Sequence, residues 1–506
     1  DRFHFLMRGV IYWLAMGINS FLAGRIGKAG SETGSRIGID CIQSKIRLDR
    51  INDLYWLPES GIDPKTVYGI EYEDYDEESV ANLNSLGVRR CYYSRNPLKI
   101  LRRMLSERSK FCGLIAVRFQ DWLKVWASPF QFLSLLGKWD IQRWVKYEEI
   151  NFRLRVTFWE SVYRQLGIRM LWSMYDYDQD KLAKAQALEN IDGLFMGSHW
   201  TNYQMVAAAN ERKVYDVFFP WGEHFVQNID TRYPFIAVFP AGYPLDYYFE
   251  AKKAGAAELR AKYPGKFILS YHDNVCSNDF TYSLETEKRL YRMLFLLLQK
   301  YDQLVVFLKP KRIDIFEQSR KDFSEIDAYI KQERMEVFTG ETPRTRFAPA
   351  EIGMASDLAV GLGISTPAAE CFFAGTMSFH ADFPGFQDNP FVKNGLNKFV
   401  YCDVESLKQA IEDRIEGRDQ KSCLDYRAEH EPLDPFQDGK AYVRTGFLIN
   451  RLQQAFIAGL DRQTALEKAK GDYYRYLSFQ GMSAAGENQL AGLSDPGERK
   501  IGARLE

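Results

Sequence analysis

The feature that most constrains the fold is a regular alternation of short apolar strands with helices between residues 145 and 430. The strand-like runs are rich in β-branched and aromatic residues and are bounded by polar or glycine-containing turns. Strands that alternate with helices form parallel sheets with both faces covered. The pattern predicts an α/β protein with strands at 168–173, 193–197, 214–219, 235–239, 266–271, 304–308, 335–338, 357–360, 377–380 and 398–401.

The length of 506 residues exceeds what one hydrophobic core usually organises, so more than one domain is expected. The turn sequence at 263–265 separates two alternating units. We expect an N-terminal helical and α/β region, two Rossmann-like domains, C-terminal helices and a disordered tail, over residues 1–140, 141–264, 265–430, 431–480 and 481–506, respectively.

The N-terminal region has a weaker pattern. Aromatic or β-branched runs at 54–60, 66–70 and 87–93 predict strands, whereas 1–50 and 98–140 are expected to be largely helical. The stretch Phe3–Ala23 is apolar, but Arg8 and Asn19 interrupt it. About 20 uninterrupted apolar residues are needed to span a bilayer. An amphipathic surface helix or a buried core helix is therefore favoured over a membrane anchor.

Composition excludes several classes of protein. The net charge of −1 and the absence of a long Lys/Arg block argue against a nucleic-acid partner. The seven cysteines include no CxxC pair, which favours reduced thiols in a cytoplasmic protein over a disulfide framework or a zinc site. The six histidines also lack metal-ligand spacing, so no metal site is predicted.

A strand, a glycine turn and a helix follow one another in Ala359–Phe373. Gly363 and Ser365 lie in the turn, Thr366 suits the N-cap, and Pro367 suits the first helical position. An exposed helix N-terminus carries partial positive charge and free N–H donors, which suit a phosphate group. An ordinary strand-to-helix connection in a parallel sheet would have a similar sequence.

Three cations follow the strand at 304–308, namely Lys309, Lys311 and Arg312. Ligands of open α/β sheets bind at the carboxyl ends of the strands. Three cations at that edge suit a phosphate or diphosphate, although a solvated basic turn would look the same. If the two strands are near neighbours, this loop and the Ser-Thr turn share one edge of the sheet.

These two motifs resemble the GT-B glycosyltransferases of bacterial surface-polysaccharide synthesis, a group that includes capsule Kdo transferases, polysialyltransferases and CDP-glycerol glycerophosphotransferases. The resemblance covers roughly residues 190–470. It depends on Phe307–Pro310, Gly363–Thr366, Ala241–Asp246, and Asp434–Gly439 with Arg444. One departure is that Lys309 stands where the family often has histidine. A lysine at this position is predicted to bind a phosphate group rather than to transfer a proton.

The resemblance implies a GT-B-like fold with two facing Rossmann-like domains, the acceptor side at 141–264 and the donor-nucleotide side at 265–430. It implies transfer of a sugar from a CMP- or UDP-linked donor to a cell-surface polysaccharide or lipid-linked glycan, as in capsule and cell-envelope synthesis. No cofactor is implied besides the nucleotide-sugar substrate, and no metal. Such acceptors reside at membranes. The expected location is therefore cytoplasmic, with peripheral contact at the inner face of the plasma membrane through the N-terminal apolar stretch.

Five further residues complete the predicted site. Glu370, one helical turn after Thr366, suits the ribose hydroxyls of a nucleotide, or simply a favourable charge near a helix N-terminus. His272 is predicted to contact the nucleotide, and Asp273 beside it is a catalytic candidate. His199 and Glu223 each follow a strand of the acceptor side and are candidates for the base that deprotonates the acceptor. Histidines at such positions are also often structural.

Two alternatives remain open at this point. A sugar-nucleotide epimerase of the same fold would need the phosphate site but no acceptor groove. A non-catalytic partner in a polysaccharide-assembly complex would use the aromatic-rich first 140 residues as an interface.

Overall fold

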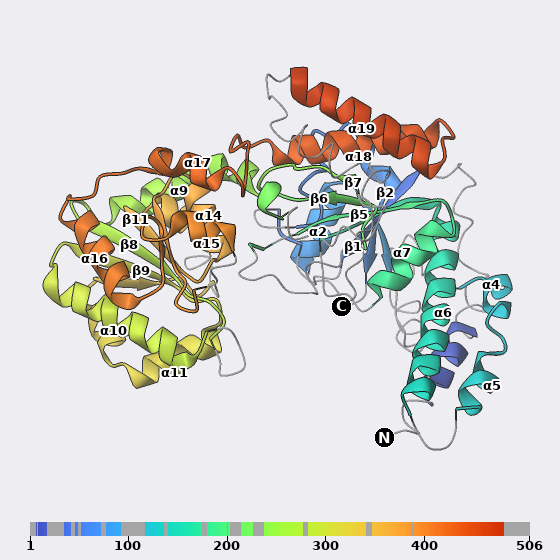
Figure 1. The fold of residues 1–506 in the computed structure, drawn as a ribbon, viewed down its shortest axis with the longest axis horizontal. Coiled ribbons are helices and arrows are strands. Elements are labelled where there is room, and N and C mark those ends of the chain that lie inside the picture. Colours follow the sequence, from blue (N-terminus) through green and yellow to red (C-terminus); the bar gives the residue numbers. More distant parts are fainter. Residues whose placement is uncertain are drawn as a thin grey trace, which may run out of the picture.

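The computed structural model consists of two α/β domains and a helical arm (Figure 1). It describes residues 7, 9–17, 35–41, 46–48, 52–71, 77–92, 117–135, 140–174, 180–199, 201–202, 214–225, 237–276, 282–340, 347–385 and 389–479.

The first domain contains a parallel sheet in the order β3-β2-β1-β4-β5-β6-β7. Helices α2 (Glu77–Ser85) and α7 (Lys181–Glu189) belong to this domain. Several strands are buried along their whole length, which explains their nearly continuous apolar sequences. The strands are β1 (Arg36–Cys41), β2 (Val67–Glu71), β3 (Arg89–Tyr92), β4 (Ile168–Ser173), β5 (Leu194–Ser198), β6 (Val217–Phe219) and β7 (Ala237–Val238).

The N-terminal region differs from the expectation in two respects. Strands β1, β2 and β3 pair into the same sheet as β4, so the sheet extends across the expected boundary at residue 140. Residues 54–60 form hydrogen-bonded turns instead of the predicted strand, with the Leu57 N–H donating to the Leu54 carbonyl at 2.9 Å. The aromatic side chains of that segment are nevertheless buried, so the apolar signal reports core packing rather than strand pairing.

The second domain contains a parallel sheet in the order β10-β9-β8-β11-β12-β13. Its strands are β8 (Phe267–His272), β9 (Leu304–Lys309), β10 (Met335–Val337), β11 (Leu358–Leu362), β12 (Ser378–Ala381) and β13 (Val400–Tyr401). Its helices are α9 (Phe249–Ala261), α10 (Leu284–Lys300), α11 (Ile313–Asp322), α12 (Glu325–Lys331), α13 (Pro349–Met354), α14 (Thr366–Phe373), α15 (Pro390–Gly395) and α16 (Val404–Ile415). The expected fold class, α/β with two Rossmann-like domains, is confirmed by these two sheets.

The C-terminal helices return to the first domain. After α17 (Arg427–His430), the chain forms α18 (Ala441–Ile457) and α19 (Arg462–Phe479), which pack into the core beside β1 and β4. The Gln453 side-chain amide donates to the Ser35 carbonyl and to the Thr66 hydroxyl, both at 2.9 Å. The first domain is therefore completed by the last helices, as Figure 1 shows. The tail expected at 481–506 lies outside the described residues.

A helical arm extends from the first domain (Figure 1). It consists of helical residues 9–17, α4 (Phe119–Leu123), α5 (Ser128–Leu133) and the long α6 (Ile141–Leu166). Asp140 caps α6 by accepting from the Arg143 N–H at 2.8 Å. Among the residues that the structure describes, no helix is both long and apolar enough to cross a bilayer.

Candidate functional site

The carboxyl edge of the second sheet brings the two predicted motifs together. In the parallel register Lys309 of β9 aligns with His272 of β8, which aligns with Gly361 of β11. The basic loop and the Ser-Thr turn therefore lie at one edge, with β8 between them. The expectation that both motifs share an edge is confirmed. Ligands of open α/β sheets bind at this kind of edge.

The turn after β11 is shaped by glycine. Gly363 has a φ of +77°, a conformation that side-chain-bearing residues rarely adopt, and a Cβ there would lie 2.1 Å from the Tyr282 hydroxyl oxygen. A Cβ on Gly361 would lie 2.5 Å from Ser365 Oγ. Glycines at both positions let the turn lie close to Tyr282, just before α10, and to the start of α14, which places Ser365 at the sheet edge.

The start of α14 differs from the prediction by one residue. Ser365, not Thr366, is the N-cap, and Thr366 is the first residue of the helix. Ser365 is only 5% exposed, yet its hydroxyl bonds to no atom among the described residues and does not cap the helix. A buried hydroxyl without a partner normally costs stability. At a helix N-terminus, such a hydroxyl suits a bound anion.

Thr366 joins the two domains. Its hydroxyl accepts a hydrogen bond from the Asn202 backbone N–H at 2.9 Å. Asn202 follows β5 at the carboxyl edge of the first sheet, and its side-chain amide is buried without a partner among the described residues. We did not predict Asn202 as a site residue. The only sequence signal was its place in the polar run after a strand, at 198–202.

The three predicted cations have different environments. Lys309 ends β9 and is half-buried in the row with His272. The Lys311 ammonium donates to Asn274 Oδ1 at 2.9 Å, which holds it beside the loop after β8. Arg312 is exposed and forms an ion pair with Asp314 at the start of α11. The structure thus brings Lys309 and Lys311 toward the edge, while the Arg312 guanidinium binds its own loop.

His272 and Asp273 end β8 in the middle of this edge. His272 is 1% exposed, and burial together with the smaller effect of nearby Lys309 lowers its pKa to about 3, so the imidazole is neutral. Its Nδ1 has no partner among the described residues, whereas Nε2 lies 3.5 Å from Cys371 Sγ. Asp273 accepts a hydrogen bond from the Lys311 N–H, and burial raises the pKa of its carboxyl group.

His199 is fully buried on the first-domain side. Its Nδ1 lies 3.0 Å from the Thr201 carbonyl, and its Nε2 accepts from the Trp221 N–H at 3.2 Å. Because a carbonyl can only accept and an amide N–H can only donate, the ring is held as one neutral tautomer. A base needs a free lone pair, and here the Trp221 N–H occupies it.

The two remaining predicted residues, Glu223 and Glu370, belong to the first and the second domain, respectively. Glu223 begins a short 3-10 helix, Glu223–Phe225, after β6, and its side chain is exposed. Glu370 is buried in α14 and accepts from the Tyr243 hydroxyl at 2.9 Å, the Ala350 N–H at 2.9 Å and the Tyr248 hydroxyl. A ribose at Glu370 would have to compete with these three donors.

Comparison with known proteins gives structural likeness only. No family model and no curated protein matches the chain. Alpha,alpha-trehalose 6-phosphate synthase from Burkholderia multivorans is similar at 13% identity and a TM-score of 0.43, covering 85% of this chain and 100% of that chain. The wall teichoic acid polymerase TagF is similar at 13% identity and a TM-score of 0.40, and the match covers 80% of this chain and 93% of that chain. Alr3699/HepE from Anabaena, solved with UDP and glucose, is similar at 10% identity and a TM-score of 0.41, and the match covers 87% of this chain and 99% of that chain.

In the part of the chain that the structure describes, no group of three or more His, Cys, Asp or Glu side chains is arranged to hold a metal ion.

Proposed function

We propose that this protein is a glycosyltransferase that moves a sugar from a nucleotide-activated donor, CMP- or UDP-linked, to a cell-surface polysaccharide or lipid-linked glycan. One observation carries the proposal. The buried, unpartnered Ser365 hydroxyl lies at the N-terminus of α14, on the same sheet edge as Lys309. A hydroxyl, free backbone N–H groups and an ammonium group together suit a phosphate-bearing ligand.

In this proposal the second domain stabilises the leaving group. Bond cleavage leaves negative charge on the nucleotide phosphate, and preorganised donors at that point lower the barrier. The α14 N-terminus and the Ser365 hydroxyl would contact the phosphate, and the Lys309 and Lys311 ammonium groups would neutralise its charge. Neutral His272 lies between these groups and adds no cost of ion burial.

The first domain would supply the acceptor side. Of the candidate bases, Glu223 has the most accessible carboxylate, because His199 is buried with its lone pair engaged and Asp273 is buried in the second domain. We therefore propose Glu223 as the group that removes the acceptor hydroxyl proton. Its loop contacts the segment between the domains, because the His224 N–H donates to the Pro432 carbonyl at 2.9 Å.

Calorimetric titration with UDP, CMP, CDP and GDP tests the donor site. We expect one of these nucleotides to bind, and Ser365→Ala and Lys309→Ala each to weaken that binding by about tenfold, the effect of losing a charge-assisted hydrogen bond. Lys253→Ala is the matched control, since Lys253 is an exposed lysine on α9 that pairs with Glu250. Absence of nucleotide binding, or equal affinity in all variants, would contradict the proposal.

Turnover assays separate transfer from other reactions of the same donor. With a nucleotide sugar and a glycan acceptor, we expect nucleotide release that depends on the acceptor and that Glu223→Gln slows by about a hundredfold or more, the scale of a general base. Conversion of the sugar nucleotide without any acceptor would indicate an epimerase instead.

A further inference from the structure

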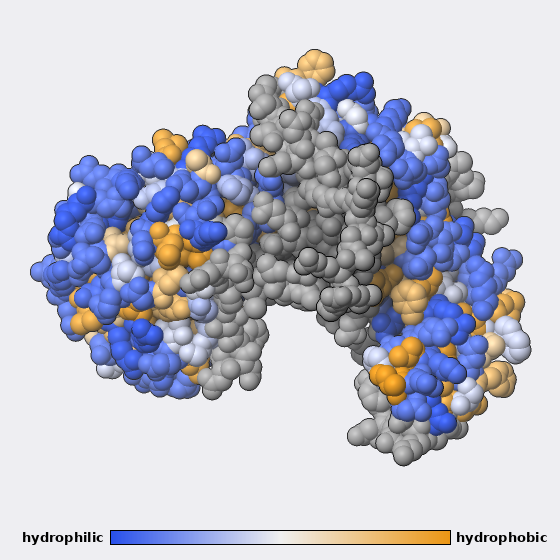
Figure 2. Space-filling view, in the orientation of Figure 1, coloured by the Kyte–Doolittle hydropathy of each residue, from blue (hydrophilic) through white to orange (hydrophobic). Residues whose placement is uncertain are grey.

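The helical arm exposes a large share of the apolar side chains on the molecular surface. Eleven of the eighteen exposed large apolar side chains among the described residues belong to the arm. Seven of them are half or more exposed, namely Ile11, Trp126, Phe130, Leu133, Ile141, Trp144 and Val145. Figure 2 shows orange residues gathered around the distal end of the arm. Large apolar side chains that gather on an exposed part of a protein in this way are typical of a site of interaction with a protein or a membrane.

Helix α6 is apolar on two faces. Tyr147, Ile150 and Leu154 are buried against the rest of the arm and the first domain. At 100° per residue, Ile141 and Val145 lie on the opposite face of the helix, near Trp144 and Phe152. A surface helix needs only one apolar face to reach its core, and the second face of α6 is exposed, with no described segment of the chain burying it.

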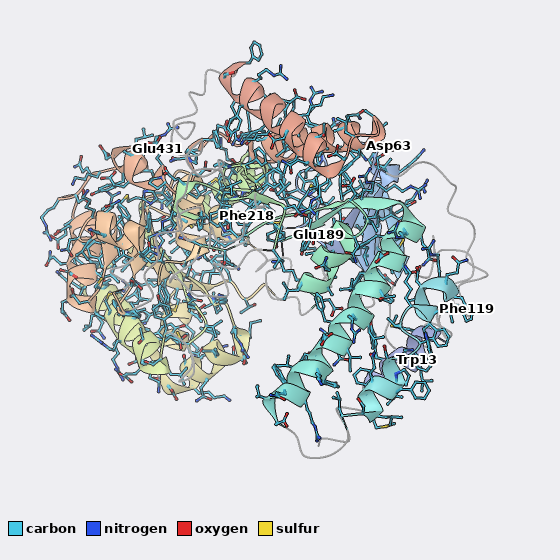
Figure 3. All side chains as sticks on the ribbon, turned by 45° about the vertical axis from the view of Figure 1, so that its right-hand side comes forward. Trp13, Asp63, Phe119, Glu189, Phe218 and Glu431 are labelled. Carbon is cyan, nitrogen blue, oxygen red and sulfur yellow. The ribbon has the colours of Figure 1, made fainter. Side chains whose placement is uncertain are left out.

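The arm is a fixed scaffold rather than a loose set of helices. Gly9 and Gly17 lie where a Cβ would clash with the rings of Phe132 and Trp122, so helix 9–17 packs closely on α4 and α5. Trp13 and Phe119 lie on the side of the arm that faces away from the second domain (Figure 3). The exposed apolar residues are thus carried by a fixed scaffold.

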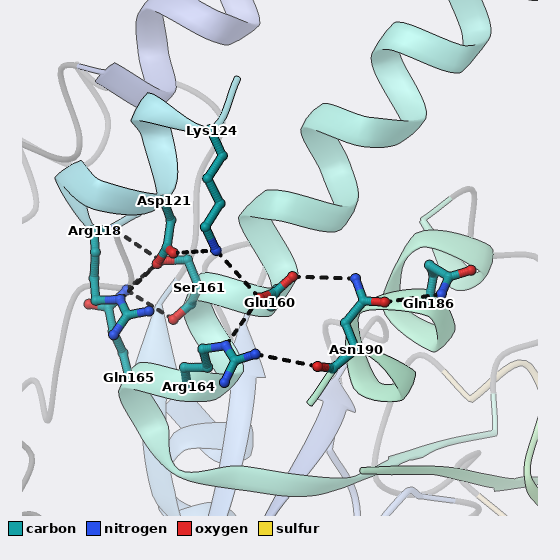
Figure 4. Close-up of polar contacts among 9 residues, drawn as sticks. All are labelled: Arg118, Asp121, Lys124, Glu160, Ser161, Arg164, Gln165, Gln186 and Asn190. Atoms are coloured by element: carbon teal, nitrogen blue, oxygen red, sulfur yellow. Dashed lines mark hydrogen bonds and ion pairs between the residues drawn. The ribbon is translucent and has the colours of Figure 1, made fainter. Parts of the chain in front are cut away.

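A polar network also ties α4 to α6 and α7 (Figure 4). Asp121 accepts from Arg118 at 2.7 Å and pairs with Lys124 at 3.0 Å, and Lys124 reaches Glu160 of α6 at 3.6 Å. Asn190, directly after α7, donates to the same Glu160 at 3.3 Å. These bonds hold α4 in place without using its exposed apolar side chains.

The charge of the surrounding sequence indicates the kind of partner. Residues 95–155 contain thirteen Lys or Arg and five Asp or Glu, of which six and four, respectively, belong to the part of the arm that the structure describes. The whole chain has a net charge of −1. Lys124 and Arg153 remain about half exposed on the arm. Exposed Trp and Phe beside basic residues suit the headgroup region of an anionic bilayer, where aromatic rings sit at the interface and cations meet lipid phosphates.

We propose that the arm docks this protein on an anionic lipid bilayer, with Trp126, Phe130 and Leu133 inserted at the interface. The contact is peripheral, and it involves α4, α5 and α6 rather than only the N-terminal apolar stretch. The surface lies apart from the candidate site, so this inference does not depend on the proposed transfer reaction.

Cosedimentation with vesicles tests the inference. We expect the full chain to bind vesicles of phosphatidylglycerol and phosphatidylcholine in equal parts. Trp126→Ser/Phe130→Ser/Leu133→Ser should weaken this binding about tenfold or more, because three apolar side chains leave the interface. The matched control is Leu296→Ser/Leu424→Ser/Ile457→Ser, which removes three equally exposed apolar side chains outside the arm and should leave binding unchanged.

A second variant and a change of lipid keep the inference falsifiable if the first variant misfolds. Ile141→Ser/Trp144→Ser should also weaken vesicle binding, with a circular dichroism melt like that of the wild type. Vesicles of phosphatidylcholine alone, or high salt, should bind the wild type more weakly. Equal vesicle binding by the wild type and both arm variants would overturn the inference. So would a wild-type dimer in sedimentation velocity that ignores vesicles and that the arm substitutions dissociate.

Nucleotide titration of the arm variants separates this inference from the proposed function. Both arm variants should bind a nucleotide as the wild type does, because none of the substituted residues lies at the sheet edge. Loss of vesicle binding with intact nucleotide binding supports the docking surface alone.

Discussion

At the scale of single residues, one buried carboxylate holds the connection between the domains together. Tyr243 and Tyr248 lie in the segment between the two sheets, and both donate their hydroxyls to Glu370 of α14. The Ala350 N–H adds a third bond to the same carboxylate. Burial raises the pKa of Glu370, while these three donors favour its ionised form. The contacts fix α14, and therefore Ser365 and Thr366 at its start.

We predict that Glu370→Ala lowers the free energy of unfolding by about 3 kcal/mol, because two buried hydroxyls and one N–H lose their acceptor. Glu370→Gln should cost only about 1 kcal/mol, since its amide can accept from Tyr248 and Ala350 and donate to the Tyr243 oxygen. Urea unfolding followed by fluorescence measures both values. A glutamine variant as stable as the wild type but with weaker nucleotide binding would instead favour the predicted ribose contact.

Site residues can be predicted from sequence when they lie at the ends of neighbouring strands of one sheet, but not when they come from different domains. Lys309, His272 and Gly361 come together because parallel strands end at the same edge, a rule that requires no coordinates. Asn202 could not be found in this way. Its bond to Thr366 depends on how one domain meets the other, and no local pattern encodes that arrangement.

At the scale of elements, strands were predictable where burial on both faces makes the sequence uniformly apolar. The strand expected at 168–173 matches β4 at both ends. Strand β1 was missed because its sequence, RIGIDC, contains charged residues and a glycine. Those residues have tertiary partners: the Asp40 carboxylate accepts from the buried Lys184 ammonium of α7 at 2.5 Å. A buried ion pair removes the apolar pattern on which strand prediction depends.

The same glycine-to-alanine substitution should change stability in opposite directions at two positions of the C-terminal helices. Gly446 of α18 lies where a Cβ would be 2.5 Å from the Trp56 carbonyl oxygen and 2.9 Å from Ser60 Cβ, whereas a Cβ on Gly471 of α19 would have no described atom outside its own stretch of helix within 4 Å. Gly471→Ala should stabilise the protein by about 0.5–1 kcal/mol through helix propensity. Gly446→Ala should destabilise it by about 2 kcal/mol, because overpacking against a backbone outweighs the same gain.

Urea unfolding of both variants checks this prediction, and circular dichroism confirms that each is folded. If Gly446→Ala were as stabilising as Gly471→Ala, the close packing of α18 on the turns at 54–60 would be wrong. The comparison is informative because the chemical change is identical and only the surroundings differ.

At the scale of the whole molecule, buried polar groups add to the apolar packing that joins the two domains, in which Trp221 and Phe225 share a core cluster with the second sheet. Arg444 of α18 is 1% exposed, forms two hydrogen bonds with Asp438, and donates to the Ala241 carbonyl at 2.7 Å. Asp434 accepts from the Tyr243 N–H at 2.9 Å. The C-terminal segment thereby holds the region between the domains from one side, while Asn202 and Thr366 join the two sheet edges.

This arrangement buries neutral histidines on both sides of the connection, with consequences for acid stability. Burial lowers the pKa of His224 and His380 to about 4, and that of His272 and His430 to about 3, from an ordinary value of 6.5. Each binds a proton more readily when unfolded, so its contribution to stability is present above pH 6.5 and is lost as the pH falls toward the folded-state value. Buried carboxyl groups with raised pKa values, such as Asp53, act in the opposite sense.

Substituting His430 alone tests how much one buried histidine contributes to the pH dependence of stability. The His430 ring stacks on Phe372 at 3.4 Å, and its Nδ1 lies 2.9 Å from the Tyr426 carbonyl. We predict that His430→Phe is destabilising near neutral pH, through loss of that hydrogen bond, but that its penalty shrinks by about 2 kcal/mol between about pH 7 and about pH 5, because the variant has no imidazole to protonate. Urea unfolding at both pH values gives the difference. The control Phe372→Leu disturbs the same stack but removes no titratable group, so its loss of stability should be equal at both pH values. If the loss of stability in His430→Phe were also independent of pH, His430 would titrate in the folded protein much as it does in the unfolded chain.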